Sequence, residues 1–238
     1  MSVYHSPELQ IENQLLAALP TEDYQRLLPY METVSLSHSQ ILWNAEESIE
    51  YVYFPNRALI SLVTIMESGE IVEVGIVGRE GMAGLTVCWG GDTNTLQAIV
   101  QIPGTAIRMS AKHLKSEFDQ CSTLHRLLLR YTQALFTHTA HTAACNRLHT
   151  IEARFARWLL IVQDRVQSNE LPLTQEFLSH MLGTRRSGVT EAASHLSKAG
   201  TIRYSRGKII ILDREALEST SCECYQTVKK EFARLLKN

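Results

Sequence analysis

The side chains with the clearest chemical potential in this sequence are two consecutive guanidinium groups, Arg185 and Arg186, within residues 173–208. An arginine can donate two parallel hydrogen bonds to O6 and N7 of guanine in the major groove of DNA. Hydroxyl and carboxylate groups follow at helical spacing. We predict base or near-base contacts, Arg186 first among them, from five residues: Arg185, Arg186, Ser187, Thr190 and Glu191. An arginine pair alone is more simply the solvated start of a helix, so the surrounding elements must carry the interpretation.

Two short helices joined by a tight turn are predicted to position these groups. Thr174 is a candidate N-cap of the first helix, and Gly183 breaks that helix. Apolar residues at one-face helical spacing within it are Phe177, Leu178, Met181 and Leu182. The second helix begins near residues 185–187 and stops at Gly200. Its predicted buried stripe consists of Val189, Ala192, Ala193 and Leu196.

A small β-hairpin is predicted next, because residues 201–204 and 208–212 alternate and are rich in β-branched side chains. Gly207 lies in the turn, where a positive φ is needed. Polar groups of the first helix and the hairpin are expected on DNA phosphates: Thr174, Gln175, Arg203, Ser205, Arg206 and Lys208. Phosphate contacts of this kind fix the position of a protein on the duplex, whereas base contacts read the sequence.

The segment QEFLSHMLGTRRSGVTEAASHLSKAGTIRYSRGKIIILD resembles the winged helix-turn-helix of the Crp/Fnr regulators, the family of the cyclic-AMP receptor protein and the fumarate and nitrate reduction regulator. The resemblance is specific over the last third of the chain. It implies a transcription regulator that binds a palindromic site in double-stranded DNA as a homodimer. It also implies a cyclic nucleotide-binding-like domain ahead of the DNA-binding domain. Contact with RNA polymerase is a further expectation, although no motif locates a surface for it.

Upstream of this segment, residues 31–109 read as short β runs separated by Gly and Asn turns. The runs are ETVSLS, ILW, YVYF, ALISLVTIM, EIVEVGIV, TLQAIVQI and TAIRM. Many short strands with no long helix between them indicate an antiparallel barrel or sandwich, most simply a jelly roll. We therefore expect an α+β protein. Its expected parts are a jelly-roll sensor domain at 1–110, a dimerisation helix at 111–146 and a winged helix-turn-helix domain at 147–238, with a loop at 168–172 and one helix in the tail.

Charge is divided unevenly along the 238 residues, although the net charge is only -2. Residues 1–110 hold 4 basic and 13 acidic side chains, whereas residues 171–212 hold 6 and 2. An acidic N-terminal half joined to a basic C-terminal module is typical of a sensor fused to a nucleic-acid reader. No apolar run approaches the length of a membrane span, and the N-terminus lacks the pattern of a signal peptide. We expect a cytoplasmic protein with no membrane partner.

Residues 111–146 contain apolar side chains that recur at alternating spacings of four and three. This heptad seam consists of Leu124, Leu128, Tyr131, Leu135, His138 and Thr142. Such a pattern is typical of a helix that packs along a partner helix, so we predict that the seam forms the homodimer. The alternative is packing against the chain's own barrel, and both can hold on different faces.

The resemblance also raises the question of a cyclic nucleotide. Relatives that bind one carry a Gly-Glu pair for the ribose and an Arg followed by a small hydroxyl residue for the phosphate. Arg79, Glu80 and Gly81 stand in the corresponding region here, but no Arg precedes the strand TLQAIVQ beside a Ser or Thr. Without that guanidinium a cyclic phosphate loses its main charge-assisted hydrogen bonds. We expect no tight binding of cyclic AMP, and a turn ion pair between Arg79 and Glu80.

Cysteine and histidine residues suggest no cofactor. The five cysteines are Cys88, Cys121, Cys145, Cys222 and Cys224, an odd number that argues against a disulfide framework. Cys222 and Cys224 could share a soft metal, but Cys-x-Cys alone lacks the second ligand pair of a zinc site. His138, His141 and His149 lie on one helical stretch without evident partners. We predict reduced, inert thiols, histidines that bind no metal, and no cofactor.

Two other classes of function compete with a DNA reader. The chain could be a ligand-binding regulatory or scaffold protein whose helix-turn-helix serves protein contacts. It could instead be an enzyme on a cupin-like barrel, which needs clustered histidine and carboxylate ligands on the strands. His38 is the only histidine within residues 31–109, so a multi-histidine metal site is not available there and we expect no enzyme. The effector, the sign of regulation and the target sequence are not encoded in any motif.

Overall fold

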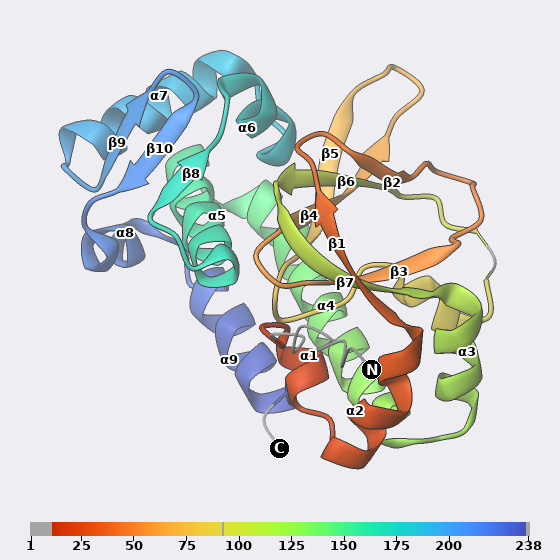
Figure 1. The fold of residues 1–238 in the computed structure, drawn as a ribbon. Helices are drawn as coiled ribbons and strands as arrows, with labels where there is room; N and C mark the ends of the chain where they lie inside the picture. The colour runs from red at the N-terminus through yellow and green to blue at the C-terminus, as the bar shows by residue number, and fades with distance from the viewer. Residues whose placement is uncertain (1–10, 92, 237–238) are drawn as a thin grey trace, which may run out of the picture.

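The computed structural model describes residues 11–91 and 93–236. Within these ranges, the N-terminal domain is built from antiparallel strands: β1 (Met31–Leu36), β2 (Ile41–Trp43), β3 (Tyr51–Pro55), β4 (Leu59–Ile65), β5 (Ile71–Val77), β6 (Gln97–Ile102) and β7 (Gly104–Ser110). They make one sheet in the order β1-β7-β3 and another in the order β2-β6-β4-β5. Each of the β runs read from the sequence is a strand, and the mixed α and β class with an N-terminal antiparallel sheet domain is confirmed (Figure 1).

Helices cover the outer faces of both sheets, so most strands are buried on two sides. In β3, Val52 and Phe54 face a helical cluster, while Tyr53 between them packs inside the barrel. In β4, Leu59 and Val63 face the C-terminal half of the chain, and Ile60 packs inside the barrel. This period-2 alternation of two apolar sets explains why the strands read as near-continuous hydrophobic runs.

The helices on the N-terminal side are α1 (Gln14–Ala17), α2 (Thr21–Leu27), the 3-10 turns η1 (Leu28–Tyr30) and η2 (Leu85–Trp89), α3 (Ala111–Asp119) and α4 (Thr123–Leu148). The next helix, α5 (Ile151–Val166), begins the C-terminal half. The segment 111–146 was expected to be one long helix after a turn at its start. It is instead two helices, because Ser110 caps α3 at the His113 amide and Cys121 takes a positive φ of 52° between α3 and α4.

The heptad seam of α4 faces the chain's own core and not the outside of the molecule. Four residues of the seam are buried, with exposed fractions of 0 to 3%: Leu124, Leu128, Tyr131 and His138. Leu135 and Thr142 are partly buried. The residues predicted to form a dimer contact therefore pack against the barrel and against a C-terminal helix, and a heptad alone does not distinguish these partners from a second chain. Within the described residues, no helix is both long and apolar enough to cross a bilayer.

The C-terminal half contains β8 (Glu170–Pro172), α6 (Gln175–Met181), α7 (Arg186–Lys198), β9 (Ile202–Ser205), β10 (Lys208–Ile211), α8 (Arg214–Thr220) and α9 (Cys224–Leu236). The loop expected at 168–172 contains β8, which pairs with β10 to complete the sheet β8-β10-β9. The tail is two helices, not one. The second of them, α9, leaves the lobe formed by α5 to α8 and packs along α4 (Figure 1).

The two halves share a buried interface. A single hydrophobic cluster contains Leu59 and Ile76 of the barrel together with Phe155 of α5 and Leu178 of α6. Across the same interface, the Arg165 guanidinium of α5 forms a 2.9 Å ion pair with Glu80, and both side chains are almost fully buried. The turn ion pair expected between Arg79 and Glu80 is therefore wrong. Glu80 needs a partner that compensates its burial, and Arg165 is the buried cation beside it.

Candidate nucleic-acid interface

The first helix of the candidate interface begins as its sequence predicts. The Oγ1 atom of Thr174 accepts a hydrogen bond from the Phe177 amide at 3.2 Å, which caps α6. Thr174 is exposed and Gln175 is partly exposed. Thr174 and Glu176 also line a groove of about 210 Å³ between α6 and the barrel, where His38 is a neighbour. The first turn of α6 is thus open to solvent at the boundary between the two halves.

The turn between α6 and α7 brings the start of the second helix to the surface. Gly183 adopts a φ of +52°, and the Thr184 amide donates to the Ser179 carbonyl at 3.0 Å. The apolar stripes of the two helices, including Leu178 and Val189, are buried against each other and against α5. All five residues predicted to contact bases are exposed: Arg185, Arg186, Ser187, Thr190 and Glu191.

Arg185 is the N-cap residue of α7 and Arg186 is its first helical residue. The Arg186 guanidinium forms an ion pair of 2.5 Å with Glu176 of α6, although both side chains are more than 60% exposed. Exposed pairs of this kind contribute little to stability, so the guanidinium can exchange this partner for a guanine. The Thr190 hydroxyl donates to the Arg186 carbonyl at 2.9 Å and keeps its acceptor lone pair free.

Gly188 is a position of close approach between helices that the sequence pattern did not single out. A Cβ atom on this residue would come within 3.0 Å of both the Ile151 side chain and the Thr184 hydroxyl. The start of α7 therefore approaches the start of α5 so closely that a Cβ at position 188 would require these side chains to shift. A glycine inside a predicted helix, with no φ requirement, is the only signal in the sequence of this close approach.

The hairpin of β9 and β10 has the two-residue turn that its sequence predicts. Ser205 pairs with Lys208, and both turn residues have positive φ values, 49° at Arg206 and 77° at Gly207. That combination matches the twist of antiparallel strands. Arg203, Ser205 and Arg206 are exposed. Lys208 is partly buried and forms an ion pair with Glu170 of β8. This partner was not predicted from the sequence, because residues 168–172 were expected to be a loop.

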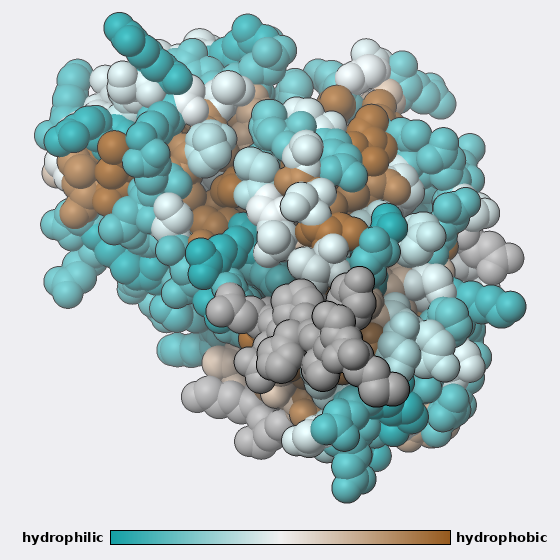
Figure 2. All heavy atoms as spheres, in the orientation of Figure 1, coloured by the Kyte–Doolittle hydropathy of each residue, from teal (hydrophilic) through white to brown (hydrophobic). Residues whose placement is uncertain are grey.

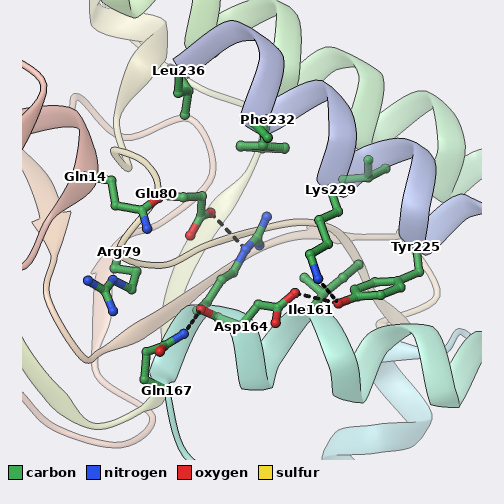
Figure 3. Close-up of a pocket in the computed structure, with 13 residues that line it drawn as sticks. Gln14, Arg79, Glu80, Ile161, Asp164, Gln167, Tyr225, Lys229, Phe232 and Leu236 are labelled. Carbon is green, nitrogen blue, oxygen red and sulfur yellow. Dashed lines mark hydrogen bonds and ion pairs between the residues drawn. The ribbon is translucent and has the colours of Figure 1, made fainter. Parts of the chain in front are cut away.

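Behind the interface, a polar network joins α8 to α5 and α9. The Arg214 guanidinium lies 2.7 Å from Asp164, and the Tyr225 hydroxyl donates to the same carboxylate at 2.8 Å. Lys229 donates to the Tyr225 oxygen at 3.0 Å. Figure 3 shows Asp164 and Lys229 both pointing to the Tyr225 hydroxyl, and all three residues line a cavity of about 500 Å³ between α5 and α9. The network fixes α8, which directly follows the hairpin. The outer rim of this lobe is mostly hydrophilic (Figure 2).

A second cavity, of about 580 Å³, lies between the barrel and α4. Its described lining contains mostly apolar and threonine side chains, among them Trp43, Trp89, Leu135 and Phe136, and includes no charged side chain. The Glu80 and Arg165 pair lines the other cavity, between α5 and α9 (Figure 3). An apolar cavity of this kind offers no charged partner for a phosphate.

Comparisons with known proteins agree with this architecture. Residues 153–220 match the family described as the Crp-like helix-turn-helix domain. FixK2 from Bradyrhizobium japonicum is similar in structure with a TM-score of 0.69 at 18% sequence identity, covering 81% of this chain and 98% of that chain. A CRP-family transcriptional regulator from Thermus thermophilus has a TM-score of 0.65 at 17% identity, covering 79% of this chain and 96% of that chain.

A third similar structure is the c-di-GMP responsive global regulator CLP of Xanthomonas campestris, with a TM-score of 0.61 at 13% identity, covering 81% of this chain and 99% of that chain. No curated protein matches the sequence. The matched domain covers the α5, α6, α7, hairpin and α8 elements described above. The resemblance noted in the sequence is thereby confirmed: residues 153–220 are a Crp-like helix-turn-helix domain, and the chain has the fold of Crp/Fnr regulators.

Proposed function

We propose that this regulator binds a palindromic DNA site as a homodimer and reads bases with the first turn of α7. The observation that carries the proposal is the exposure of Arg185 and Arg186 at the N-terminal end of a helix whose opposite face is buried. A helix in this position can enter the major groove end-on, as in other helix-turn-helix proteins. Ser187, Thr190 and Glu191 lie on the same exposed side and complete the reading surface.

Phosphate contacts come from the two elements that flank α7. Thr174 and Gln175 begin α6, where backbone amides and the helix dipole favour an anion. Arg203, Ser205 and Arg206 project from the hairpin as a wing, and Lys208 joins them once its exposed ion pair with Glu170 opens. These contacts are independent of sequence and set the angle at which α7 meets the groove.

The homodimer uses the face of α4 that the protomer leaves open. Leu129 is 49% exposed and Phe136 is 73% exposed, and Ala140 and Ala143 are exposed on the same face. These positions repeat at spacings of seven, four and three, which is a second heptad seam, turned by about 100° round the helix from the buried one. Crp/Fnr regulators act as dimers, and a two-fold axis along α4 would place two α7 helices about 34 Å apart, one turn of DNA.

Cyclic AMP is not the effector in this proposal. The cavity beside α4 has no charged side chain among its described lining residues, so a cyclic phosphate there would be buried without a cation. Glu80 is held by Arg165 and is not available to a ribose. We further propose that the regulator works in the cytoplasm and contacts RNA polymerase from its bound site.

The test is selection of duplexes from a random DNA library by the purified protein, without added ligand, at near-physiological salt. We expect an enriched palindrome with half-sites one helical turn apart. A matched pair of variants sharpens the result: Arg186→Ala removes a cation at the start of α7, and Lys198→Ala removes one at its end. The palindrome should be lost or degenerate with Arg186→Ala and retained with Lys198→Ala. Absence of enrichment with and without cyclic nucleotides and cell extract would favour a helix-turn-helix that serves protein contacts.

A further inference from the structure

Four metal-ligating side chains that are far apart in the sequence meet at one point of the fold. Cys145 lies near the end of α4, and His149 is the C-cap residue of that helix. Cys222 lies in the turn between α8 and α9, and Cys224 is the first residue of α9. Their ligand atoms all lie within 4.8 Å of one another. The second ligand pair that Cys222 and Cys224 lack locally is brought to them by the fold, from α4.

The distances suit one metal ion. The Cys145 and Cys222 Sγ atoms are 3.4 Å apart, and the Cys224 Sγ lies 3.9 Å from the His149 Nδ1. Zinc bound tetrahedrally at about 2.3 Å to sulfur and about 2.0 Å to nitrogen places its ligand atoms roughly 3.5–3.8 Å apart. All three thiols are free, and 3.4 Å is far outside the bond length of a disulfide. Donors this close surround a single ion and leave no room for a multi-iron cluster.

We propose that Cys145, His149, Cys222 and Cys224 form a structural zinc site of the Cys₃His type. Three of the ligands are buried and His149 is partly exposed, which leaves an entry path for the ion. A set of three thiolates and one imidazole favours zinc over magnesium or calcium, which prefer oxygen ligands. The site has four protein ligands, the closed arrangement typical of structural zinc.

The surroundings of His149 support its role as a ligand. Its Nε2 atom lies 3.2 Å from a carboxylate oxygen of Glu223, while Nδ1 points to the Cys224 sulfur. A carboxylate that accepts the N–H of a ligating imidazole fixes the ring and the tautomer, and it raises the basicity of the nitrogen that binds metal. Glu223 stands between Cys222 and Cys224 in the chain, so one turn supplies two ligands and this orienting group.

The charge around the cluster also fits. Zinc with three thiolates carries a net charge of -1, and two buried guanidinium groups, Arg154 and Arg157, act electrostatically on these cysteines. The Nε atoms of both arginines are buried without a hydrogen-bond partner.

A metal at this point would tie two distant parts of the chain together. His149 lies two residues before α5, where the chain passes from α4 into the DNA-binding lobe. Cys222 and Cys224 lie where it leaves that lobe and returns along α4. The ion would therefore link the α4–α5 connection to the α8–α9 turn, the two places where the chain passes between the halves. It would also fix the direction in which α5 leaves α4. This inference does not depend on which DNA sequence, if any, α7 reads.

The first experiment measures the metal content of the full-length protein, purified with a thiol reductant and without chelator. We expect one zinc per protomer, lost on prolonged chelation and restored by zinc alone. The variants Cys222→Ser and Cys224→Ser should each lower the zinc occupancy per protomer by about tenfold or more. Cys121→Ser, which alters an exposed thiol of the α3–α4 turn, is the matched control and should retain a full zinc.

A second readout does not depend on the variants folding. Cobalt added to the chelated wild-type protein should give the ligand-field bands of a tetrahedral ion and a thiolate charge-transfer band, and zinc should abolish both. Chelation should lower the melting temperature of the wild-type protein and leave that of Cys224→Ser unchanged. The proposal is overturned by folded protein that binds neither zinc nor cobalt, by iron with acid-labile sulfide, or by a Cys145–Cys222 disulfide as the resting state under reducing conditions.

Discussion

The indole Nε1 of Trp158 donates a 2.8 Å hydrogen bond to Oε1 of Glu73, and this bond joins α5 to strand β5 of the barrel. The other carboxyl oxygen of Glu73 is 2.5 Å from the Ser61 hydroxyl. Glu73 is buried, and burial raises its pKa to about 7, against the lowering effects of these hydrogen bonds and of Arg165 and Arg157. A carboxyl group therefore titrates near neutral pH inside the interface between the barrel and the lobe formed by α5 to α8.

Replacing Glu73 with glutamine should make the protein more stable at high pH. The carboxyl has an ordinary pKa of 4.5 and a folded pKa of about 7, so the folded state keeps a proton that the unfolded state loses. Its contribution to stability is full below pH 4.5, falls as the pH rises through 7, and is then constant. The amide mimics the protonated acid. The unfolding free energy of Glu73→Gln relative to wild type should rise by roughly 3 kcal/mol between pH 4.5 and pH 8.

The comparison between variant and wild type is needed because His138 acts in the opposite direction. Burial and the nearby Arg165 hold its pKa well below 6.5, so its contribution rises with pH up to that value. Both proteins contain His138, so its contribution cancels in the difference. Denaturant unfolding at several pH values measures the difference, and parallel curves for the two proteins would show that Glu73 does not retain its proton.

Substituting Gly81 with alanine should destabilise the barrel. A Cβ atom at this position would meet the Tyr131 ring and hydroxyl at 2.2 to 2.6 Å, and Tyr131 is fully buried in α4. Overpacking of a rigid aromatic contact costs about 1–3 kcal/mol or more. Gly91→Ala is the control, because the nearest atom to its added Cβ is 3.6 Å away. Thermal unfolding should show a lower melting temperature for Gly81→Ala alone; equal values for the two variants would mean that α4 moves away without cost.

The strands and the helix-turn-helix could be predicted from local patterns because their apolar residues alternate against a sheet or a helix of fixed geometry. Thr174, Gly183 and Gly207 all have the local roles that their residue types suggested. Contacts between residues far apart in the chain left no such local pattern in the sequence. The burial of the α4 seam depended on α9, and the partner of Glu80 was Arg165 of α5, 85 positions away in the chain.

The cluster of Cys145, His149, Cys222 and Cys224 could not be predicted from the sequence either, because its two pairs of residues are far apart in the chain. Cys222 and Cys224 were interpreted as inert because the sequence near them supplies no further ligand. Cys145 and His149 are four residues apart on α4, which places both on one face of a helix end, but nothing local indicates that the α8–α9 turn comes to rest there. Metal sites assembled from two distant pairs become visible only once the fold is known.

Arg186→Ala should weaken binding to the selected DNA site by about 1–3 kcal/mol and relax the sequence preference at the base pair it reads. The reason is the loss of a bidentate hydrogen-bond pair with a base, which random DNA does not offer in the same register. Binding titrations with the selected duplex and with a scrambled one measure the effect, and Lys198→Ala serves as the charge-matched control. An equal loss on both duplexes would assign Arg186 to the phosphates.

Lys208→Ala should weaken the binding of all sequences alike. Its ammonium group lies on the wing and is expected to neutralise one phosphate, so the slope of the logarithm of affinity against the logarithm of salt concentration should flatten by about one. The pair with Glu170 offers an internal comparison, because Glu170→Gln frees the ammonium and should strengthen binding at low salt. A change confined to the selected site would contradict a phosphate role for Lys208.

Phe136→Glu should convert the dimer to monomers. The Phe136 side chain is 73% exposed in the protomer, and in the proposed dimer a carboxylate at this position would be buried against the partner without a compensating charge. Met66→Glu makes a similar change at another exposed apolar residue, just after the β4 strand and far along the chain from α4, and should leave the dimer intact. Sedimentation velocity of the three proteins gives the oligomeric state. Because the proposed dimer places two α7 helices on one palindrome, Phe136→Glu should also lose affinity for the palindrome while keeping that for a single half-site. A dimer that survives in Phe136→Glu would move the interface away from this face of α4.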